Sequence, residues 1–291
     1  MNKVVIITDS TSGISPEIAQ KHGIGVVATH VIMDGKDYPD TEIDMGKLYA
    51  RLEGKENLPT TSAANTGQFL QLYHKLSQHA DAILVITLTS AYSATYGTAI
   101  QASEMAREKL PKTTIKIIDS RTVAAAQLLI VLQAAKAAAQ GKSLEEVIEL
   151  VNDMIPRGND LSTRDTLFFI DKGGLAYDAR SWAKAETESA GTFRAILKND
   201  ASTGGITKPV ARAKTRTQIM EKIVDLVREK IGDKKLHAAL VHTNVPEQAE
   251  QLKKMLLAQF QCEEFYITEA TGATAVKNGR GLMQLGFYGS D

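Results

Sequence analysis

Short, continuous apolar runs alternate with helical patterns along the first half of the chain. The apolar runs are rich in β-branched residues and occupy positions 3–8, 24–33, 82–87 and 114–118. Runs of this kind are typical of strands that are buried on both faces of a parallel sheet. Because helical periodicity separates them, we predict a doubly wound α/β domain over residues 1–157.

The second half of the chain shows a similar alternation with less regular spacing. Strands are predicted at 167–170, 193–197, 205–210, 237–242 and 264–268, and amphipathic helices at 215–231 and 246–260. We interpret residues 158–291 as a second, smaller α/β domain that is built on a smaller mixed sheet. The segment Arg157-Gly158-Asn159-Asp160 is the predicted boundary.

Polar clusters occur where the predicted strands pass into helices. They are Asp9-Ser10-Thr11, Thr61-Ser62, Ser90 with Ser93, and Asp119-Ser120. In an open α/β sheet this edge is where ligands bind. Hydroxyl groups, backbone N–H groups and the positive end of a helix dipole all favour an anion at such a position. The pattern therefore predicts a hydroxyl-lined crevice that binds an oxyanion.

Composition limits the classes of partner. The 291 residues include 34 Lys and Arg and 34 Asp and Glu, so nucleic acid and anionic membranes are not expected as main partners. A single cysteine, Cys262, excludes an internal disulfide and suits the cytoplasm. The start of the chain is too short and too polar for a signal peptide. The longest apolar segment, 123–139, contains Gln127, Gln133 and Lys136, which favours a buried helix over a membrane span.

Common cofactor and metal motifs do not fit the chain. The segment 23–28 matches GxGxxA, but it leads into a strand and not into a helix. No Walker-type phosphate loop is present. His74 and His79 are five residues apart on a predicted helix and therefore lie on different faces. We expect no metal and no cofactor.

Ser93 leaves an enzymatic alternative open. It follows a strand and precedes a helix, as the nucleophile of serine hydrolases does, although its flanks lack the GxSxG pattern. His242, at a predicted strand end in the other domain, is the candidate base. The chain is therefore also compatible with a serine-dependent acyl hydrolase, whereas a helix-capping serine would look the same in the sequence.

Five short motifs and a glycine-rich C-terminus occur in a characteristic order. The motifs are Thr8-Asp9-Ser10-Thr11-Ser12, Thr60-Thr61-Ser62, Ser90-Ala91-Tyr92-Ser93-Ala94-Thr95-Tyr96, Ile118-Asp119-Ser120 and Asp171-Lys172-Gly173-Gly174. In this order they resemble the DegV proteins of bacteria over nearly the whole length. The resemblance implies a two-domain fold that buries a long-chain fatty acid in a tunnel, with the carboxylate near the domain interface. It implies a carrier without enzymatic activity, and some members present the carboxylate to the ATP-binding subunit of a fatty acid kinase.

The resemblance also assigns roles to individual residues. Thr61, Ser62 and Ser93 match the hydroxyl groups that hold the carboxylate. The other positions of the predicted site are Ala94, Lys277 and Asn278, with Asp9, Ser10 and Asp119 in supporting positions. In this scheme the first domain carries the carboxylate-binding edge and the second closes the acyl tunnel.

Three residues depart from the family pattern. Ala94 stands where a glycine is usual and adds a methyl group near the ligand. Leu175 replaces the arginine of a Gly-Gly-Arg motif, and Lys277 replaces a histidine. A lysine still pairs with an anion but does not change protonation near neutral pH. We expect Ala94 and Lys277 to distinguish this chain from its relatives.

Overall fold

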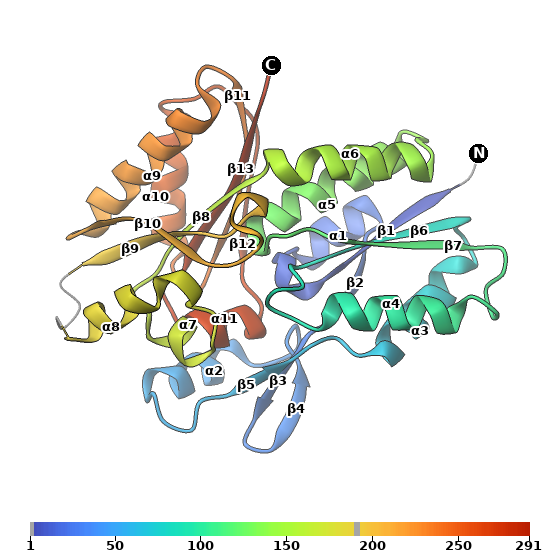
Figure 1. The fold of residues 1–291 in the computed structure, drawn as a ribbon, viewed down its shortest axis with the longest axis horizontal. Coiled ribbons are helices and arrows are strands. Elements are labelled where there is room, and N and C mark those ends of the chain that lie inside the picture. The colour runs from blue at the N-terminus through green and yellow to red at the C-terminus, as the bar shows by residue number, and fades with distance from the viewer. Residues whose placement is uncertain (1–2, 189–192) are drawn as a thin grey trace.

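The computed structural model describes residues 3–188 and 193–291, and these form three sheets with helices around them (Figure 1). The first sheet is parallel, in the order β2-β1-β6-β7. Its strands are β1 (Val4–Asp9), β2 (Gly25–Val27), β6 (Ala82–Thr87) and β7 (Thr114–Asp119). The strand pairs β1–β2, β1–β6 and β6–β7 are all parallel, with Val4 opposite Ala82 and Ala82 opposite Thr114. This confirms the parallel sheet that was predicted for the first half.

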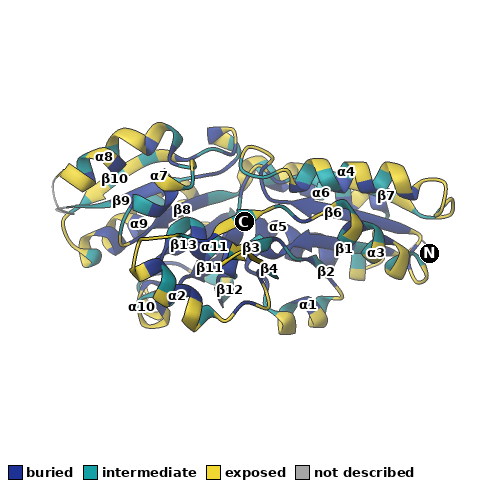
Figure 2. Ribbon diagram, turned by 90° about the horizontal axis from the view of Figure 1, so that it is seen from below, coloured by how far each residue is buried: buried dark blue, intermediate teal, exposed yellow. Residues whose placement is uncertain are grey.

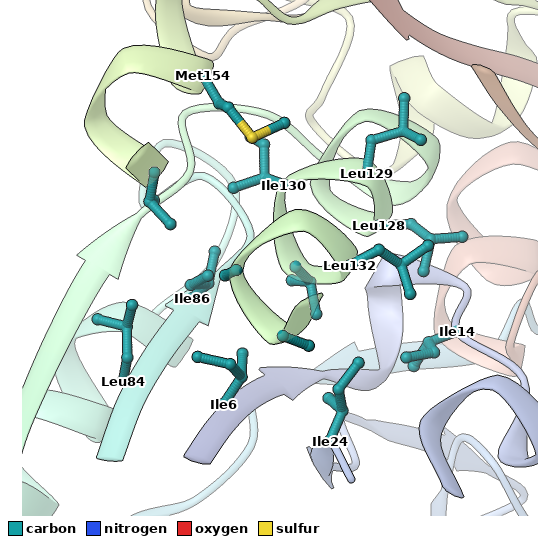
Figure 3. Packing of buried hydrophobic residues seen from close by; sticks show 14 of the residues in the cluster. Ile6, Ile14, Ile24, Leu84, Ile86, Leu128, Leu129, Ile130, Leu132 and Met154 are labelled. Atoms are coloured by element: carbon teal, nitrogen blue, oxygen red, sulfur yellow. The ribbon is translucent and has the colours of Figure 1, made fainter. Parts of the chain in front are cut away.

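Helices cover both faces of the parallel sheet. One face packs against α3 (Thr66–Ser77) and α4 (Thr95–Ala106), and the other packs against α1 (Pro16–His22), α5 (Ala124–Ala139) and α6 (Leu144–Arg157). Ile6, Leu84 and Ile86 point toward α5, as Figure 3 shows, while Ile7 and Val85 point to the opposite face. The period of two along each strand thus places apolar side chains on both faces. In Figure 2 the buried strands lie between helices whose outer faces are exposed.

The second sheet is mixed, in the order β10-β9-β8-β13-β11-β12. Its strands are β8 (Asn159–Thr163), β9 (Arg194–Lys198), β10 (Lys208–Ala213), β11 (Lys235–His242), β12 (Cys262–Glu269) and β13 (Met283–Ser290). β11 and β12 are parallel and the other pairs are antiparallel. Helices α9 (Arg216–Ile231) and α10 (Pro246–Leu257) cover one face. By strand count this sheet is the larger one, so the expectation of a smaller sheet is wrong.

The underestimate has two sources in the chain. β8 and β13 were not predicted, because polar residues and glycines interrupt their apolar pattern. The apolar run at 167–170, predicted as a strand, instead begins the short helix α7 (Phe168–Lys172), which ends at Gly173. A short apolar run does not distinguish a strand from a buried helix by periodicity alone. Helix α8 (Arg180–Glu188) follows α7, and 3₁₀ turns occur along the chain at Ser10–Ser12, Tyr177–Ala179 and Ala201–Thr203.

A small antiparallel sheet lies beside the first. It contains β3 (His30–Met33), β4 (Lys36–Pro39) and β5 (Thr60–Ser62) in the order β4-β3-β5, and it packs with α2 (Met45–Glu53), α7 and α11 (Gly272–Asn278). The predicted single strand 24–33 is therefore two strands in different sheets. The chain changes sheets at Thr29, whose backbone N–H donates to Ser10 and whose hydroxyl donates to Asp40.

Helix α5 packs against the first two sheets at once. Leu128 and Leu129 belong to the same apolar cluster as Ile6 of β1 and Val241 of β11. β13 passes so close to α5 that a Cβ atom at Gly286 would overlap the backbone of Ala125 and Ala126. The predicted division after residue 157 falls where the chain passes from α6 to β8, and it stays a prediction. No helix among residues 3–188 and 193–291 is long and apolar enough to cross a bilayer.

Candidate functional site

A cavity of about 320 Å³ lies where the three sheets meet. The carboxyl ends of β1 and β6, strand β5, the start of α5, and helices α7 and α11 contribute to its lining, as do β8, β9 and β13. Figure 1 shows α7 and α11 next to each other beside β5. All six residues of the predicted site line this cavity, namely Thr61, Ser62, Ser93, Ala94, Lys277 and Asn278. The fold thus brings together residues that are more than 200 positions apart in the chain.

Thr61 and Ser62 reach the cavity from β5. This short edge strand pairs with β3, with Val31 opposite Thr61 and His30 opposite Ser62. The strand ends just before Asn65, which caps α3 through a capping box. Thr61 and Ser62 are therefore not the cap of this helix, and their hydroxyl groups are available to a ligand.

Ser93 lies in the turn between β6 and α4. Its Oγ accepts a hydrogen bond from the backbone N–H of Thr95 (3.2 Å) and lies 2.9 Å from the Thr95 hydroxyl. Ala94 occupies the N-cap position of α4, where no side chain caps the helix. The uncapped start of a twelve-residue helix beside a serine hydroxyl suits a negatively charged group.

Lys277 supplies a positive charge from α11. Its Nζ donates to the backbone carbonyl of Gly173 at 3.4 Å, and within residues 3–188 and 193–291 no carboxylate forms an ion pair with it. Burial lowers the pKa of the ammonium group, because the charged form is separated from water. Helix α11 is fixed at its start, where Gly272 donates its N–H to the carbonyl of Asp40 and leaves no room for a Cβ atom. Lys277 therefore places a positive charge in the cavity wall, on a helix that is fixed in position, and the charge has no ion-pair partner among the described residues.

The three supporting residues of the prediction do not line the cavity. Asp9 is buried and accepts hydrogen bonds from the N–H groups of Thr11 (3.1 Å) and Leu88 (2.8 Å), both of which are lining residues. Burial raises the pKa of this carboxyl group. Gln127 of α5 also donates to Asp9 at 3.1 Å. Asp9 thus positions two parts of the wall and does not itself line the cavity.

Ser10 and Asp119 act in a similar way. The Ser10 hydroxyl accepts the N–H of Thr29, another lining residue, at 2.9 Å. Asp119 accepts hydrogen bonds from the N–H and the hydroxyl of Ser90 and from the N–H of Arg121. It therefore orders the turns after β6 and β7 that lead into the helices.

A second polar wall comes from the six-stranded sheet and was not predicted. It includes Ser162 and Arg164 at the end of β8, Asn199 after β9, and Gln284 of β13. Because β8 and β13 lack a clear strand pattern, the pattern of apolar residues does not indicate that these residues face a common site. Only the unusual polarity of segment 159–165 marks this part of the chain.

The candidate base His242 does not line the cavity. No histidine is among the lining residues, and His242 lies elsewhere, buried at the end of β11. Among the described residues, Ser93 forms side-chain hydrogen bonds only within its own turn, with Thr95. Within the described ranges no group of three His, Cys, Asp or Glu side chains is placed to hold a metal ion. The hydroxyl groups of Thr61, Ser62 and Ser93 and the ammonium group of Lys277 thus equip the cavity to bind an anion.

Comparisons with known proteins identify the family and the fold of the chain. A DegV domain-containing protein of Clostridium perfringens is 32% identical over 257 residues, which cover 87% of each chain. A structure of a DegV family protein from Thermus thermophilus, described by its fatty acid binding, has a TM-score of 0.88 at 22% identity over 100% of both chains. A stearic acid-binding protein from Eubacterium ventriosum has a TM-score of 0.88 at 18% identity, over 99% of this chain and 98% of its own. The family profile "Uncharacterised protein, DegV family" matches residues 3–289, and the chain belongs to the DegV family.

Proposed function

We propose that this chain binds a fatty acid and holds its carboxylate between Thr61, Ser62, Ser93 and Lys277. One observation carries the proposal: hydroxyl groups from two elements and an uncompensated ammonium group from a third line the same cavity. Ala94 and Asn278 complete this part of the wall. Fatty acid binding by proteins of the same family and fold supports the assignment.

The carboxylate contacts and the acyl chain make different contributions. A hydrogen bond to a charged group contributes about 1.5–3 kcal/mol, and each buried methylene about 0.8 kcal/mol. The head-group contacts thus fix the orientation of the acid, while the chain adds affinity in proportion to the length that is buried. In this role Ser93 donates a hydrogen bond and does not attack a substrate.

In the proposed function the protein is a carrier of the acid and not an enzyme. A carrier delivers its acid to a second protein, and the family resemblance makes an ATP-binding fatty acid kinase subunit the partner to test. Such delivery requires the carboxylate to be held reversibly by hydrogen bonds and charge, which is the chemistry that Thr61, Ser93 and Lys277 offer.

The direct test is organic extraction of the purified protein followed by mass spectrometry. We expect about one fatty acid per chain, or uptake of one equivalent by delipidated protein in calorimetry. The double variant Thr61→Ala with Ser93→Ala should bind more weakly and keep its fold. Absence of both extracted acid and uptake would contradict the proposal, and hydrolysis of an acyl ester that is lost in Ser93→Ala would favour the enzymatic alternative.

A further inference from the structure

Basic side chains gather at one end of an otherwise neutral chain. Residues 193–216 contain six lysine and arginine residues and a single carboxylate, Asp200, whereas the whole chain has 34 cationic and 34 anionic residues. Asp200 is buried and lies 3.3 Å from Lys198, so it does not offset the exposed cations. The segment forms β9, β10 and the start of α9, and Figure 1 shows β9 and β10 with α8 at the end of the molecule opposite the N-terminus.

Strand β10 presents its basic residues along an open edge. It is the outermost strand of the six-stranded sheet, so a strand of the described chain borders it on one side only. Lys208, Val210 and Arg212 are exposed along it, and the exposed Lys214 follows before α9. The intervening Ala211 packs against the apolar cluster under α9. The period of two along the strand thus turns the cations outward.

Arg212 lies at the centre of this surface and is held by aromatic rings. Its guanidinium carbon lies 5.3 Å from the ring centre of Phe193 and 5.7 Å from that of Trp182, and the two rings meet edge to face. Such contacts hold the planar group and leave its N–H donors free. Among residues 3–188 and 193–291, no carboxylate forms an ion pair with Arg212 or Lys214. Aromatic residues and arginine are enriched at the centres of protein interfaces.

Two further arginines at this end share one carboxylate. Arg194 and Arg216 both donate to the same oxygen of Asp165, and both arginine side chains remain partly exposed. One carboxylate offsets only one of the two charges, so this group adds to the positive charge of the surface. We call the surface the basic face and define it by Trp182, Phe193, Arg194, Arg212, Lys214 and Arg216.

The rim of the basic face distinguishes between classes of anionic partner. Asp178 lies 3.9 Å from Lys208 and Glu188 lies 3.8 Å from Lys184, and all four side chains are exposed. These carboxylates repel a continuous array of phosphates, as in DNA or an anionic bilayer, whereas a protein surface can match charges of both signs. Of the large apolar side chains that are exposed in the described ranges, only Val210 belongs to this end, which is too little to insert into lipid.

The basic face covers the outer side of a cavity wall. Trp182 and Phe193 pack in the same apolar cluster as Ile170, Leu175 and Leu197. The last three of these residues line the cavity. A protein bound at the basic face is therefore separated from the cavity by a single layer of side chains.

We propose that the basic face docks a partner protein through a carboxylate-rich surface of that partner. Charge complementarity carries the proposal, because the central cations of the face lack ion-pair partners in the described part of a chain that is neutral as a whole. Arg212, held between two rings, supplies an anchor of the kind that dominates binding at interfaces. The position outside the cavity wall makes the protein that receives the acid the candidate partner, and this last step rests on the proposed function.

The first test titrates the full chain with three defined polyanions, namely a fluorescent oligoglutamate peptide, a DNA duplex and vesicles of phosphatidylglycerol. We expect the peptide to bind, and to bind more weakly as the salt concentration rises. Lys214→Glu should weaken peptide binding about threefold or more, and Arg212→Glu with Lys214→Glu about tenfold or more. Lys222→Glu with Lys230→Glu, which makes the same charge change on exposed positions of α9, is the control and should bind normally. Binding of DNA or vesicles as tightly as the peptide would overturn the proposal.

The second test identifies the partner in the cells that produce the chain. A photo-reactive residue is placed at Val210, within the docking region, or at the exposed Leu257 of α10 as a control. We expect an acidic protein to be crosslinked from position 210 only, to be lost in Arg212→Glu with Lys214→Glu, and to bind the chain after purification. Absence of a crosslinked protein, or the same products from both positions, would contradict the docking role.

Extraction of bound acid separates this inference from the proposed function. The variant Lys214→Glu changes a side chain without a hydrogen bond or ion pair to the described residues, so it should fold and retain as much fatty acid as the unmodified protein. Loss of the acid from this variant would place the basic face in the ligand site and overturn the inference. A crosslinked acidic partner on a chain that never binds an acid would refute fatty acid binding and leave the docking surface intact.

Discussion

Replacing Lys277 by methionine tests the head-group assignment most directly. Methionine keeps much of the length and the apolar stem of the side chain but removes the ammonium group. That group now makes one long hydrogen bond, 3.4 Å to Gly173, and no ion pair among the described residues, so little structure depends on it. A hydrogen bond to a carboxylate from a charged donor contributes about 1.5–3 kcal/mol. The dissociation constant for a fatty acid should therefore rise by about 10- to 150-fold.

The same residue predicts a pH dependence of binding. Burial lowers the pKa of Lys277 in the free protein, and a bound carboxylate opposes this shift because it favours the charged form. The affinity for the acid should therefore be highest while the ammonium is protonated and should fall as the pH rises through the lowered pKa. In Lys277→Met this decline should be absent. The stability of the ligand-free protein should change in the opposite sense, rising between the lowered pKa and the ordinary pKa of lysine, because the unfolded chain then binds more protons.

The assay is calorimetric titration of delipidated protein at low ionic strength over a series of pH values. Lys222→Met, which removes an exposed lysine of α9, is the matched control and should bind like the unmodified protein. Thermal melts show whether each variant is folded. Unchanged affinity in Lys277→Met, together with the same pH profile as the unmodified protein, would refute the role of this ammonium group.

Three further predictions concern the turn after β6 and the packing of α5. Ser93→Ala removes one donor and should weaken fatty acid binding by about tenfold in calorimetry, whereas complete loss would show that the acyl chain contributes little. Gly286→Ala forces a methyl group into the backbone of α5 and should lower the unfolding free energy by about 3 kcal/mol or more. As a control, Gly97→Ala places its methyl group in open space and should raise the unfolding free energy by up to about 1 kcal/mol. Ala124 has a φ of 45°, so Ala124→Gly should leave the unfolding free energy unchanged or raise it by up to about 1 kcal/mol. Ala135→Gly, within α5, should instead lower the unfolding free energy by about 1 kcal/mol or more. Equal losses of unfolding free energy in the two variants, measured by chemical denaturation, would contradict the backbone strain at Ala124.

The parallel sheet was predictable because its strands are apolar on both faces. Residues such as Ile6 and Ile7 point to opposite layers of helices, so the run in the sequence is continuous. The hydroxyl groups at Thr61 and Ser93 were also visible, since each follows a recognisable strand or precedes a helix. The cavity to which they belong was not derivable from the residues alone, because Lys277 joins them only through the packing of α11.

The pattern of apolar and polar residues along the sequence did not predict the second polar wall. β8 carries Asp160 and Ser162 at buried positions, and β13 carries Gln284. Buried polar residues of this kind are tolerated because they bond to each other, as Gln284 does to Asp160. A sequence records neither the pairing of two distant strands nor the partners that satisfy such groups. For the same reason the apolar run before Gly173 was wrongly predicted as a strand, since the helix α7 that it forms is fixed by contacts with α11.

The close contact between Gly286 and α5 has a consequence for the rate of ligand exchange. β13 of the six-stranded sheet contacts the backbone of α5 without an intervening side chain, and α5 also packs on the four-stranded sheet. This close packing opposes translation or rotation of one sheet relative to the other. A hinge between them is therefore a poor route for an acid that enters or leaves. The short helices α7 and α11, of five and seven residues, belong to the cavity wall and lie outside that junction. We expect exchange to be limited by local opening of these helices, so that the off-rate of the acid follows hydrogen exchange of their amides and not global unfolding.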